Sequence, residues 1–313
     1  TDGMLGMLVL ACADLGLLLT TADVAAAMSV EALLGTDRVF AADLQALRPH
    51  PGQAASAANL TALLAGSAIV ASHRHGDTRV QDAYSMRCAP QVAGAARDAL
   101  DGSRAVAARE LASAIDNPVV LEDGRVESVG NFHGAPLALA LDTLAVAVAP
   151  LGAIAERRTD RLLDPARSAG LPPFLAHDPG VDSGLMLAQY AQAAMVAENR
   201  RLAAPASADS LPTSAMQEDH VSMGWAAGRK LRTALDNLAR ILAVEAVAAA
   251  RGLDLRAPLA PAKATAAVRD ALRQRVRGPG PDRWLAPELA AAADLVRSGA
   301  LVNAAELVAG PLA

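Results

Sequence analysis

Long aliphatic segments separated by proline and glycine constrain the fold of this chain more than any other feature. Alanine and leucine dominate these segments and have high helix propensities, whereas aromatic residues, which favour strands, make up only 2%. We therefore expect an all-α fold, a bundle of long helices. The long segments lie near 2–20, 52–72, 91–115, 134–162, 181–203, 221–252 and 263–277, with shorter ones near 287–297 and 300–308.

One stretch departs from the helical pattern. The segment NPVVLEDGRVESVGNF has two short β-like runs around Asp123-Gly124, a pair typical of tight hairpin turns. We expect a small β-hairpin near 118–130. We also expect residues 1–260 to form a central helical bundle that carries the loops of the site, and residues 261–313 to form a C-terminal region of short helices in the same unit.

The charge balance excludes some classes of partner. The formal net charge is −5 and the isoelectric point is near 5.7, so we expect a small-molecule ligand and no nucleic-acid partner. Asp14 interrupts the apolar first segment and no basic stretch precedes it. This pattern favours a buried core helix over a membrane span or a signal peptide, and we expect no membrane partner.

Cysteine and histidine spacing indicates neither disulfides nor zinc. Cys12 and Cys88 have neither CxxC nor Cys/His spacing, so we expect reduced thiols and a cytoplasmic location. His73 and His75 flank Arg74 in an expected loop and do not belong to a set with zinc-ligand spacing. We expect no metal site.

Polar residues gather in the stretch SADSLPTSAMQEDHVSM, residues 207–223. Ser214 and Gln217 fit a capping box, and Glu218 precedes the longest expected helix, whose dipole favours negative charge at its N-terminus. A single cap uses two residues, whereas residues 209–222 of this run supply nine polar groups. Many of them need another partner, which indicates a binding surface as the alternative to a cap.

A second cluster of functional side chains is QDAYSMRCAPQ, residues 81–91. Gln81, Tyr84 and Arg87 recur every three residues, so in a helix they project from one side. An arginine can bind a carboxylate through two parallel hydrogen bonds, and a tyrosine can transfer a proton. The cluster suits an amino-acid ligand, although a half-buried tyrosine beside a surface arginine is an equally simple interpretation.

The third candidate is SVGNFHGAP, residues 128–136, directly after the expected hairpin. Phe132, one of three phenylalanines, lies between Asn131 and His133, and glycines flank the group. Glycine lets the backbone approach a ligand closely. A plain junction between hairpin and helix explains the segment nearly as well.

These motifs occur in one order along the chain. QDAYSMRCAPQ is followed by DNPVV, GNFHGAP, ERRTDRLLDP, LPPFL and SLPTSAMQEDHVSM. From TDGMLGML to about ARGLDLRAP, the chain in this way resembles the histidine ammonia-lyase family, within the aromatic amino-acid lyases. Met216 departs from the pattern, because other members have an asparagine there.

The resemblance implies a long-helix bundle of the aromatic amino-acid lyase and fumarase-like type, a homotetramer, and active sites built from three subunits. It implies loss of ammonia from L-histidine to give trans-urocanate, with a methylidene-imidazolone electrophile made from an internal Ala-Ser-Gly. No Ala-Ser-Gly occurs in the chain. In the family this tripeptide lies upstream of the segment matching TDGMLGML. We therefore expect the N-terminal part of the same enzyme as a partner, and no activity from this chain alone.

The resemblance also implies roles for individual residues. Arg87 would hold the substrate carboxylate with Gln81 nearby, and Tyr84 would lie beside the electrophile and support a proton transfer. Phe132 would line the electrophile pocket, and Glu218 would face the substrate imidazole. A carboxylate accepts a hydrogen bond from a ring N–H, whereas a phenyl ring would leave it unpaired at a cost on the order of a few kcal/mol.

Other functions stay open at this point. A phenylalanine or tyrosine ammonia-lyase or aminomutase would share the fold, although Glu218 argues against it because phenylalanine lyases have an amide-rich segment here. The fumarase and argininosuccinate lyase group has a similar loop, but its proline and lysine are absent from TSAMQEDH. A non-catalytic helical assembly subunit is an alternative of another class, because the chain lacks the electrophile.

Overall fold

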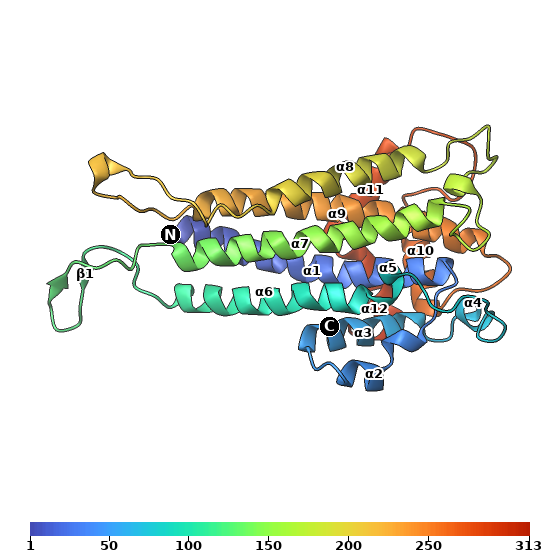
Figure 1. Cartoon of the computed structure of the whole chain (residues 1–313), viewed down its shortest axis with the longest axis horizontal. Helices are drawn as coiled ribbons and strands as arrows, with labels where there is room; N and C mark the ends of the chain where they lie inside the picture. Colours follow the sequence, from blue (N-terminus) through green and yellow to red (C-terminus); the bar gives the residue numbers. More distant parts are fainter.

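Five long helices lie alongside one another and set the long axis of the molecule (Figure 1). The computed structural model describes residues 1–313. The long helices are α1 (Asp2–Ala32), α6 (Ala89–Leu111), α7 (Ala135–Leu163), α8 (Met186–Leu202) and α9 (Gly224–Leu255). The predicted all-α bundle is confirmed.

Shorter elements complete the chain. The short α-helices are α2 (Ala42–Ala46), α3 (Pro51–Leu64), α4 (Ala68–Ala71), α5 (Tyr84–Arg87), α10 (Lys263–Arg273), α11 (Ala286–Arg297) and α12 (Ala300–Ala309). Single 3-10 turns are η1 (Arg38–Phe40), η2 (Pro173–Leu175) and η3 (Ser214–Met216). Proline at the first or second position begins α3, α6, α7 and α11, where its fixed φ suits a helix and its missing N–H costs nothing.

The core lies where α1, α7 and α8 pack against α9, and it consists almost entirely of alanine, leucine and valine. Alanine lets helix axes approach closely, so a core with few aromatic residues needs many helix contacts. By length and composition, α1 and α7 could each cross a membrane. In the most apolar stretch of each helix, 44% and 56% of the residues are buried inside the protein. Central helices of a bundle have the same composition, and both contribute to this core.

Helix α1 continues well past its expected end at residue 20. Asp23 and Glu31 lie in this extension, and both side chains are buried and paired. Asp23 pairs with Arg97, and Glu31 accepts a hydrogen bond from the Thr265 hydroxyl. Burial raises the pKa of both carboxyl groups. The contact with Thr265 joins the C-terminal helices to the bundle, while the division at residue 260 stays a prediction.

The predicted hairpin is present. Strand β1 (Val119–Val120) pairs antiparallel with β2 (Val126–Glu127), and Gly124 takes a φ of 84° in the turn between them. Glycine adopts such a positive φ without a steric penalty. The hairpin projects beyond the ends of the long helices (Figure 1).

A buried ion pair joins three of the long helices. Arg158 on α7 donates to both carboxylate oxygens of Glu245 on α9, with 3.0 Å between Nη2 and Oε2. Their side chains are only 2% and 0% exposed. The Ser29 hydroxyl on α1 donates to the same carboxylate at 2.8 Å. A charge buried this deeply is tolerated only because its partners surround it.

Replacing Arg158 with methionine tests the importance of this pair. We expect Arg158→Met to lower the free energy of unfolding by about 3–5 kcal/mol, because it leaves the Glu245 carboxylate buried and unpaired. Urea denaturation followed by circular dichroism measures the change. The control is Arg275→Met, which breaks an exposed pair with Asp294 and should cost at most about 1 kcal/mol. Equal losses for the two variants would contradict the expectation.

Candidate active site

Tyr84 and Arg87 lie together on the single turn of α5. The Arg87 guanidinium stacks on the Tyr84 ring, with 4.6 Å between Cζ and the ring centroid. Tyr84 is 72% exposed, so its hydroxyl is open to a ligand. Arg87 also donates from Nε to the Asp82 carbonyl at 2.9 Å. The two residues therefore form a preformed pair of a phenol and a guanidinium.

Gln81 does not share a helical face with this pair, contrary to the expected spacing. The backbone at Ala83, which precedes α5, is extended with φ −62° and ψ 154°, so the helix begins only at Tyr84. Gln81 lies in the bend before it and lines a cavity of about 410 Å³ together with Arg79 and Asp82. Its place near Arg87 comes from the loop that precedes α5.

The other two predicted residues, Phe132 and Glu218, lie in neighbouring loops. Phe132 is 47% exposed just before α7. The next residue, His133, stacks on His220 with ring centroids 5.5 Å apart, and its Nε2 lies 3.2 Å from the His220 carbonyl oxygen. This contact holds the segment after the hairpin against the polar run before α9.

Gly134 has a packing role here. A Cβ at this position would lie 2.4 Å from the Met4 Cε and 3.2 Å from the Ser222 Oγ. The glycine therefore makes room for α1 and for the start of α9. A Cβ at Gly130, by contrast, would meet no atom within 4 Å. The sequence-based idea that both glycines admit a ligand is not supported at Gly134.

The polar run is an exposed loop. The sequence left a helix cap and a binding surface open for it, and the structure does not show the cap. Helix α9 begins at Gly224, well past Ser214 and Gln217, and its N-cap residue Met223 provides no side-chain hydrogen bond. Within the loop, Thr213 and Glu218 form an isolated antiparallel bridge, and the Thr213 hydroxyl donates to the Glu218 Oε2. The bonded Thr213 leaves Oε1 as the free acceptor.

Three consecutive residues of this loop have left-handed backbone conformations. Ser214, Ala215 and Met216 have φ values of 50°, 53° and 74°. Such conformations cost a residue with a Cβ roughly 1–2 kcal/mol each and persist where the surroundings determine them, which is common at binding sites. The turn brings Thr213 and Glu218 together at the base of the loop.

Within one chain, the two groups of candidate residues lie at opposite ends of the long helices. Arg158 on α7 donates from Nη1 to the Ser85 carbonyl on α5 at 3.1 Å, whereas Phe132 directly precedes the first turn of α7 at Ala135. At a rise of about 1.5 Å per residue, Ala135 and Arg158 lie roughly 35 Å apart along α7. Figure 1 shows the same separation, with α5 toward one end and both β1 and the loop before α9 at the other. No single chain brings Arg87 and Glu218 around one amino acid.

Two residues that hold the site were missed from the sequence. Asp82 belongs to the QDAYSMRCAPQ motif, but only the structure shows that its carbonyl binds Arg87. Arg158 holds α5 in place through its hydrogen bond to the Ser85 carbonyl. Its signal was the charged stretch ERRTDR, residues 156–161, near the end of a helix that is apolar over most of its length. No group of three or more His, Cys, Asp or Glu side chains is placed to hold a metal ion.

Comparison with known sequences places these loops in a family. The family model described as aromatic amino acid lyase matches residues 1–274. Histidine ammonia-lyase of Streptomyces avermitilis is 68% identical and covers 100% of this chain and 61% of its own length. Histidine ammonia-lyase of Sorangium cellulosum is 50% identical, with 100% and 62% covered. The chain thus spans about 61% of the length of such curated relatives.

Solved structures agree with this placement. A tyrosine aminomutase from Streptomyces globisporus is similar with a TM-score of 0.92 and 36% identity, over 98% of this chain and 62% of that one. Histidine ammonia-lyase from Trypanosoma cruzi has a TM-score of 0.89 and 39% identity, over 97% and 57%. Because the matching family model includes the helices and both loops of the candidate site, the chain belongs to the aromatic amino acid lyase family.

Proposed function

We propose that the whole protein is a histidine ammonia-lyase that eliminates ammonia from L-histidine to give trans-urocanate. The observation that carries this proposal is the Glu218 carboxylate, which the Thr213 hydroxyl holds in an exposed loop with Oε1 free. The relatives named histidine ammonia-lyase, at 68% identity across the whole chain, support it. Free thiols at Cys12 and Cys88 agree with the cytoplasmic location that we also propose.

Arg87 and Gln81 would bind the carboxylate end of the substrate. The Arg87 Nε is already used by the Asp82 carbonyl and its face covers Tyr84, which leaves the two terminal nitrogens for a carboxylate. A planar guanidinium binds a carboxylate through two parallel hydrogen bonds and so fixes its orientation. The neutral Gln81 amide lies in the loop ahead of Arg87 and can donate a further hydrogen bond to the substrate.

Glu218 would select the ring of the substrate. Its free oxygen accepts a hydrogen bond from an imidazole N–H, an interaction that phenyl and phenol rings cannot return at the same position. Phenylalanine and tyrosine ammonia-lyase or aminomutase activity is the second candidate, which the fold similarity to a tyrosine aminomutase supports. We place it second because a ring without an N–H at that position would leave Oε1 of Glu218 unpaired.

The electrophile would lie between Tyr84 of one chain and Phe132 of another. Both aromatic side chains are exposed in the isolated chain, at 72% and 47%, and they suit a flat uncharged group. A methylidene-imidazolone, when present, supplies an electrophilic carbon that makes the substrate amine a better leaving group. Tyr84 would hold or move a proton at its hydroxyl. No Ala-Ser-Gly occurs in residues 1–313, so we propose that this group comes from the N-terminal part of the same enzyme.

A homotetramer would join the separated halves of the site. Within one chain, Arg87 and Glu218 lie at opposite ends of the long helices. Two neighbouring chains that run antiparallel can place the Arg87 end of one beside the Glu218 end of the other. Large apolar side chains remain exposed along the helices, which favours further burial by association. They include Leu10, Leu139, Val146, Leu187, Tyr190 and Trp225. A non-catalytic assembly subunit would need the same surfaces but not the free Glu218 oxygen.

Glu218→Gln tests the choice of ring. In the complete enzyme we expect kcat/KM for histidine to fall about 10- to 100-fold, because the hydrogen bond from the imidazole N–H loses its charged acceptor. The bias against phenylalanine should weaken at the same time. The control is Asp219→Asn, a neighbouring exposed acid in the same loop. Unchanged kinetics on histidine would remove Glu218 from the site.

Mixing two inactive variants tests whether the site spans chains. Full-length Arg87→Met and Glu218→Ala should each be nearly inactive. Co-expressed in equal amounts, they should regain about a quarter of wild-type activity, because random assembly then leaves that share of the sites with both residues intact. The readout is urocanate absorbance per tetramer. No recovery in verified mixed tetramers would mean that both residues come from one chain.

The source of the electrophile has a separate test. We expect a preparation of residues 1–313 alone to release no ammonia from histidine, because it has no Ala-Ser-Gly. Adding or co-expressing the N-terminal part should bring activity. An ammonia assay on a preparation checked by intact mass measures this. Activity from residues 1–313 alone would contradict the proposed chemistry.

A further inference from the structure

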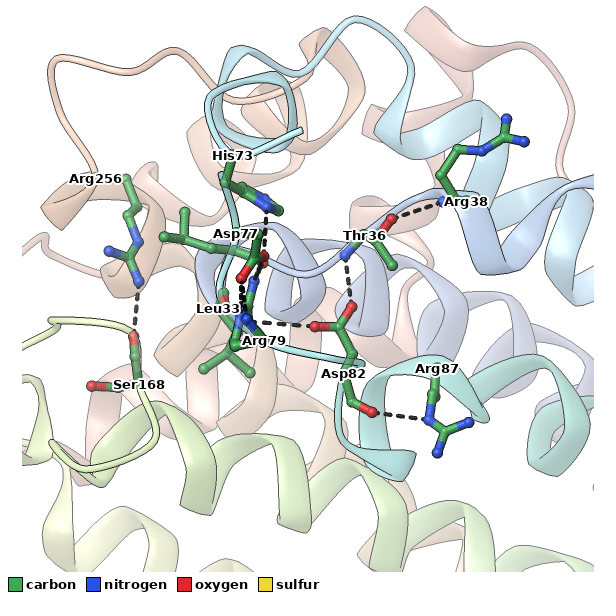
Figure 2. A network of polar contacts seen from close by, with 11 residues as sticks. Leu33, Thr36, Arg38, His73, Asp77, Arg79, Asp82, Arg87, Ser168 and Arg256 are labelled. Carbon is green, nitrogen blue, oxygen red and sulfur yellow. Dashed lines mark hydrogen bonds and ion pairs between the residues drawn. The ribbon is translucent and has the colours of Figure 1, made fainter. Parts of the chain in front are cut away.

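The loop between α4 and α5 is tied to the end of α1 by one arginine (Figure 2). Arg79 donates to the Leu33 carbonyl at 3.4 Å and to the Leu34 carbonyl, at the C-terminus of α1. It also pairs with Asp77 at 2.7 Å and with Asp82 at 3.4 Å. Hydrogen bonding between Arg79 and Asp77 raises the pKa of the guanidinium and lowers the pKa of the carboxyl. The loop is thus held to a rigid helix end by a charged network.

Asp82 is the member of this network nearest to the candidate site. Its side chain is only 5% exposed. The carboxylate accepts a hydrogen bond from the Thr36 backbone N–H at 2.7 Å and pairs with Arg79. These two contacts hold both oxygens and so tether the side chain of Asp82 to Thr36 and to Arg79. The main-chain carbonyl belongs to the residue that is tethered in this way.

That carbonyl accepts the hydrogen bond from the Arg87 Nε at 2.9 Å. Figure 2 shows the two terminal nitrogens of Arg87 pointing away from Asp82 and from the network. Tyr84 covers one face of the same guanidinium. Arg87 is consequently held at one edge and one face, and its terminal nitrogens form an outward-facing pair of donors. A guanidinium without this support would sample several rotamers.

We propose that Asp82 is a positioning residue for Arg87, whose guanidinium it holds in the orientation that binds a substrate carboxylate. Arg79 and Thr36 act one step further away, by fixing the Asp82 carboxylate. This inference rests on the proposed role of Arg87 in carboxylate binding. It adds a path from the end of α1 to the substrate, which a sequence motif alone does not contain.

Asp82→Asn in the complete enzyme tests the proposal with little change in volume. Asparagine keeps an acceptor for the Thr36 N–H but loses the ion pair with Arg79. We expect KM for histidine to rise about tenfold with a smaller fall in kcat, because a charged hydrogen-bonded contact is displaced in the ground state as well as in the transition state.

Two ligands separate positioning from general damage. Imidazole-4-propionate has the ring and the carboxylate, whereas histamine has the ring and the amine but no carboxylate. Calorimetry on the holoenzyme should show about tenfold weaker binding of imidazole-4-propionate by Asp82→Asn and unchanged binding of histamine. The control Asp37→Asn breaks a nearby ion pair with Arg74 at 2.7 Å. It should change the affinity for neither ligand. Equal losses for both ligands would make Asp82 merely structural and overturn the proposal.

Arg87→Met distinguishes this inference from the proposed function. If Arg87→Met weakens imidazole-4-propionate but Asp82→Asn does not, the positioning role is wrong while the role of Arg87 stands. If Arg87→Met leaves that affinity unchanged, both fail. The double variant completes the cycle, because Asp82→Asn should cause no further loss once Arg87 is absent. A further tenfold loss in the double variant would show that Asp82 does not act through Arg87.

Discussion

The buried ion pair between Arg158 and Glu245 is the constraint on which the rest of the structure depends. It joins α7 to α9, and Ser29 adds α1 to the same carboxylate. Arg158 has a donor left over, Nη1, which binds the Ser85 carbonyl on α5. The side chain that joins the long helices therefore also positions α5, the turn that carries Tyr84 and Arg87. Core packing and site geometry share one residue here.

Rigid long helices separate the two halves of the site. A helix such as α7 acts as a spacer of roughly 1.5 Å per residue, so residues near its two ends cannot move together. Arg87 and Glu218 therefore cannot meet within one chain, and each lies on a stiff support. In the proposed homotetramer, association would bring two preformed halves together, and little ordering would have to accompany substrate binding.

Both halves use a carboxylate that is already partnered. Glu218 accepts from the Thr213 hydroxyl in a strained turn, and Asp82 accepts from the Thr36 amide beside Arg79. In each case one contact fixes the acid while another polar group remains directed outward, namely Oε1 of Glu218 and the terminal nitrogens of Arg87. Groups held in this way lose little entropy when a ligand arrives, which favours affinity and selectivity together.

The sequence alone determined the helical class and the hairpin around Asp123-Gly124, because helix propensity and turn chemistry are local properties. It named the candidate residues through the resemblance that the order of the motifs carries. It misplaced the end of α1, since a buried Glu31 looks polar until its partner Thr265 is known. It also left the run around Glu218 open between a helix cap and a binding surface. Only the tertiary structure decided which polar groups are satisfied across the bundle and that Arg87 and Glu218 lie at opposite ends. Those facts depend on contacts between residues far apart in the chain, which no local pattern encodes.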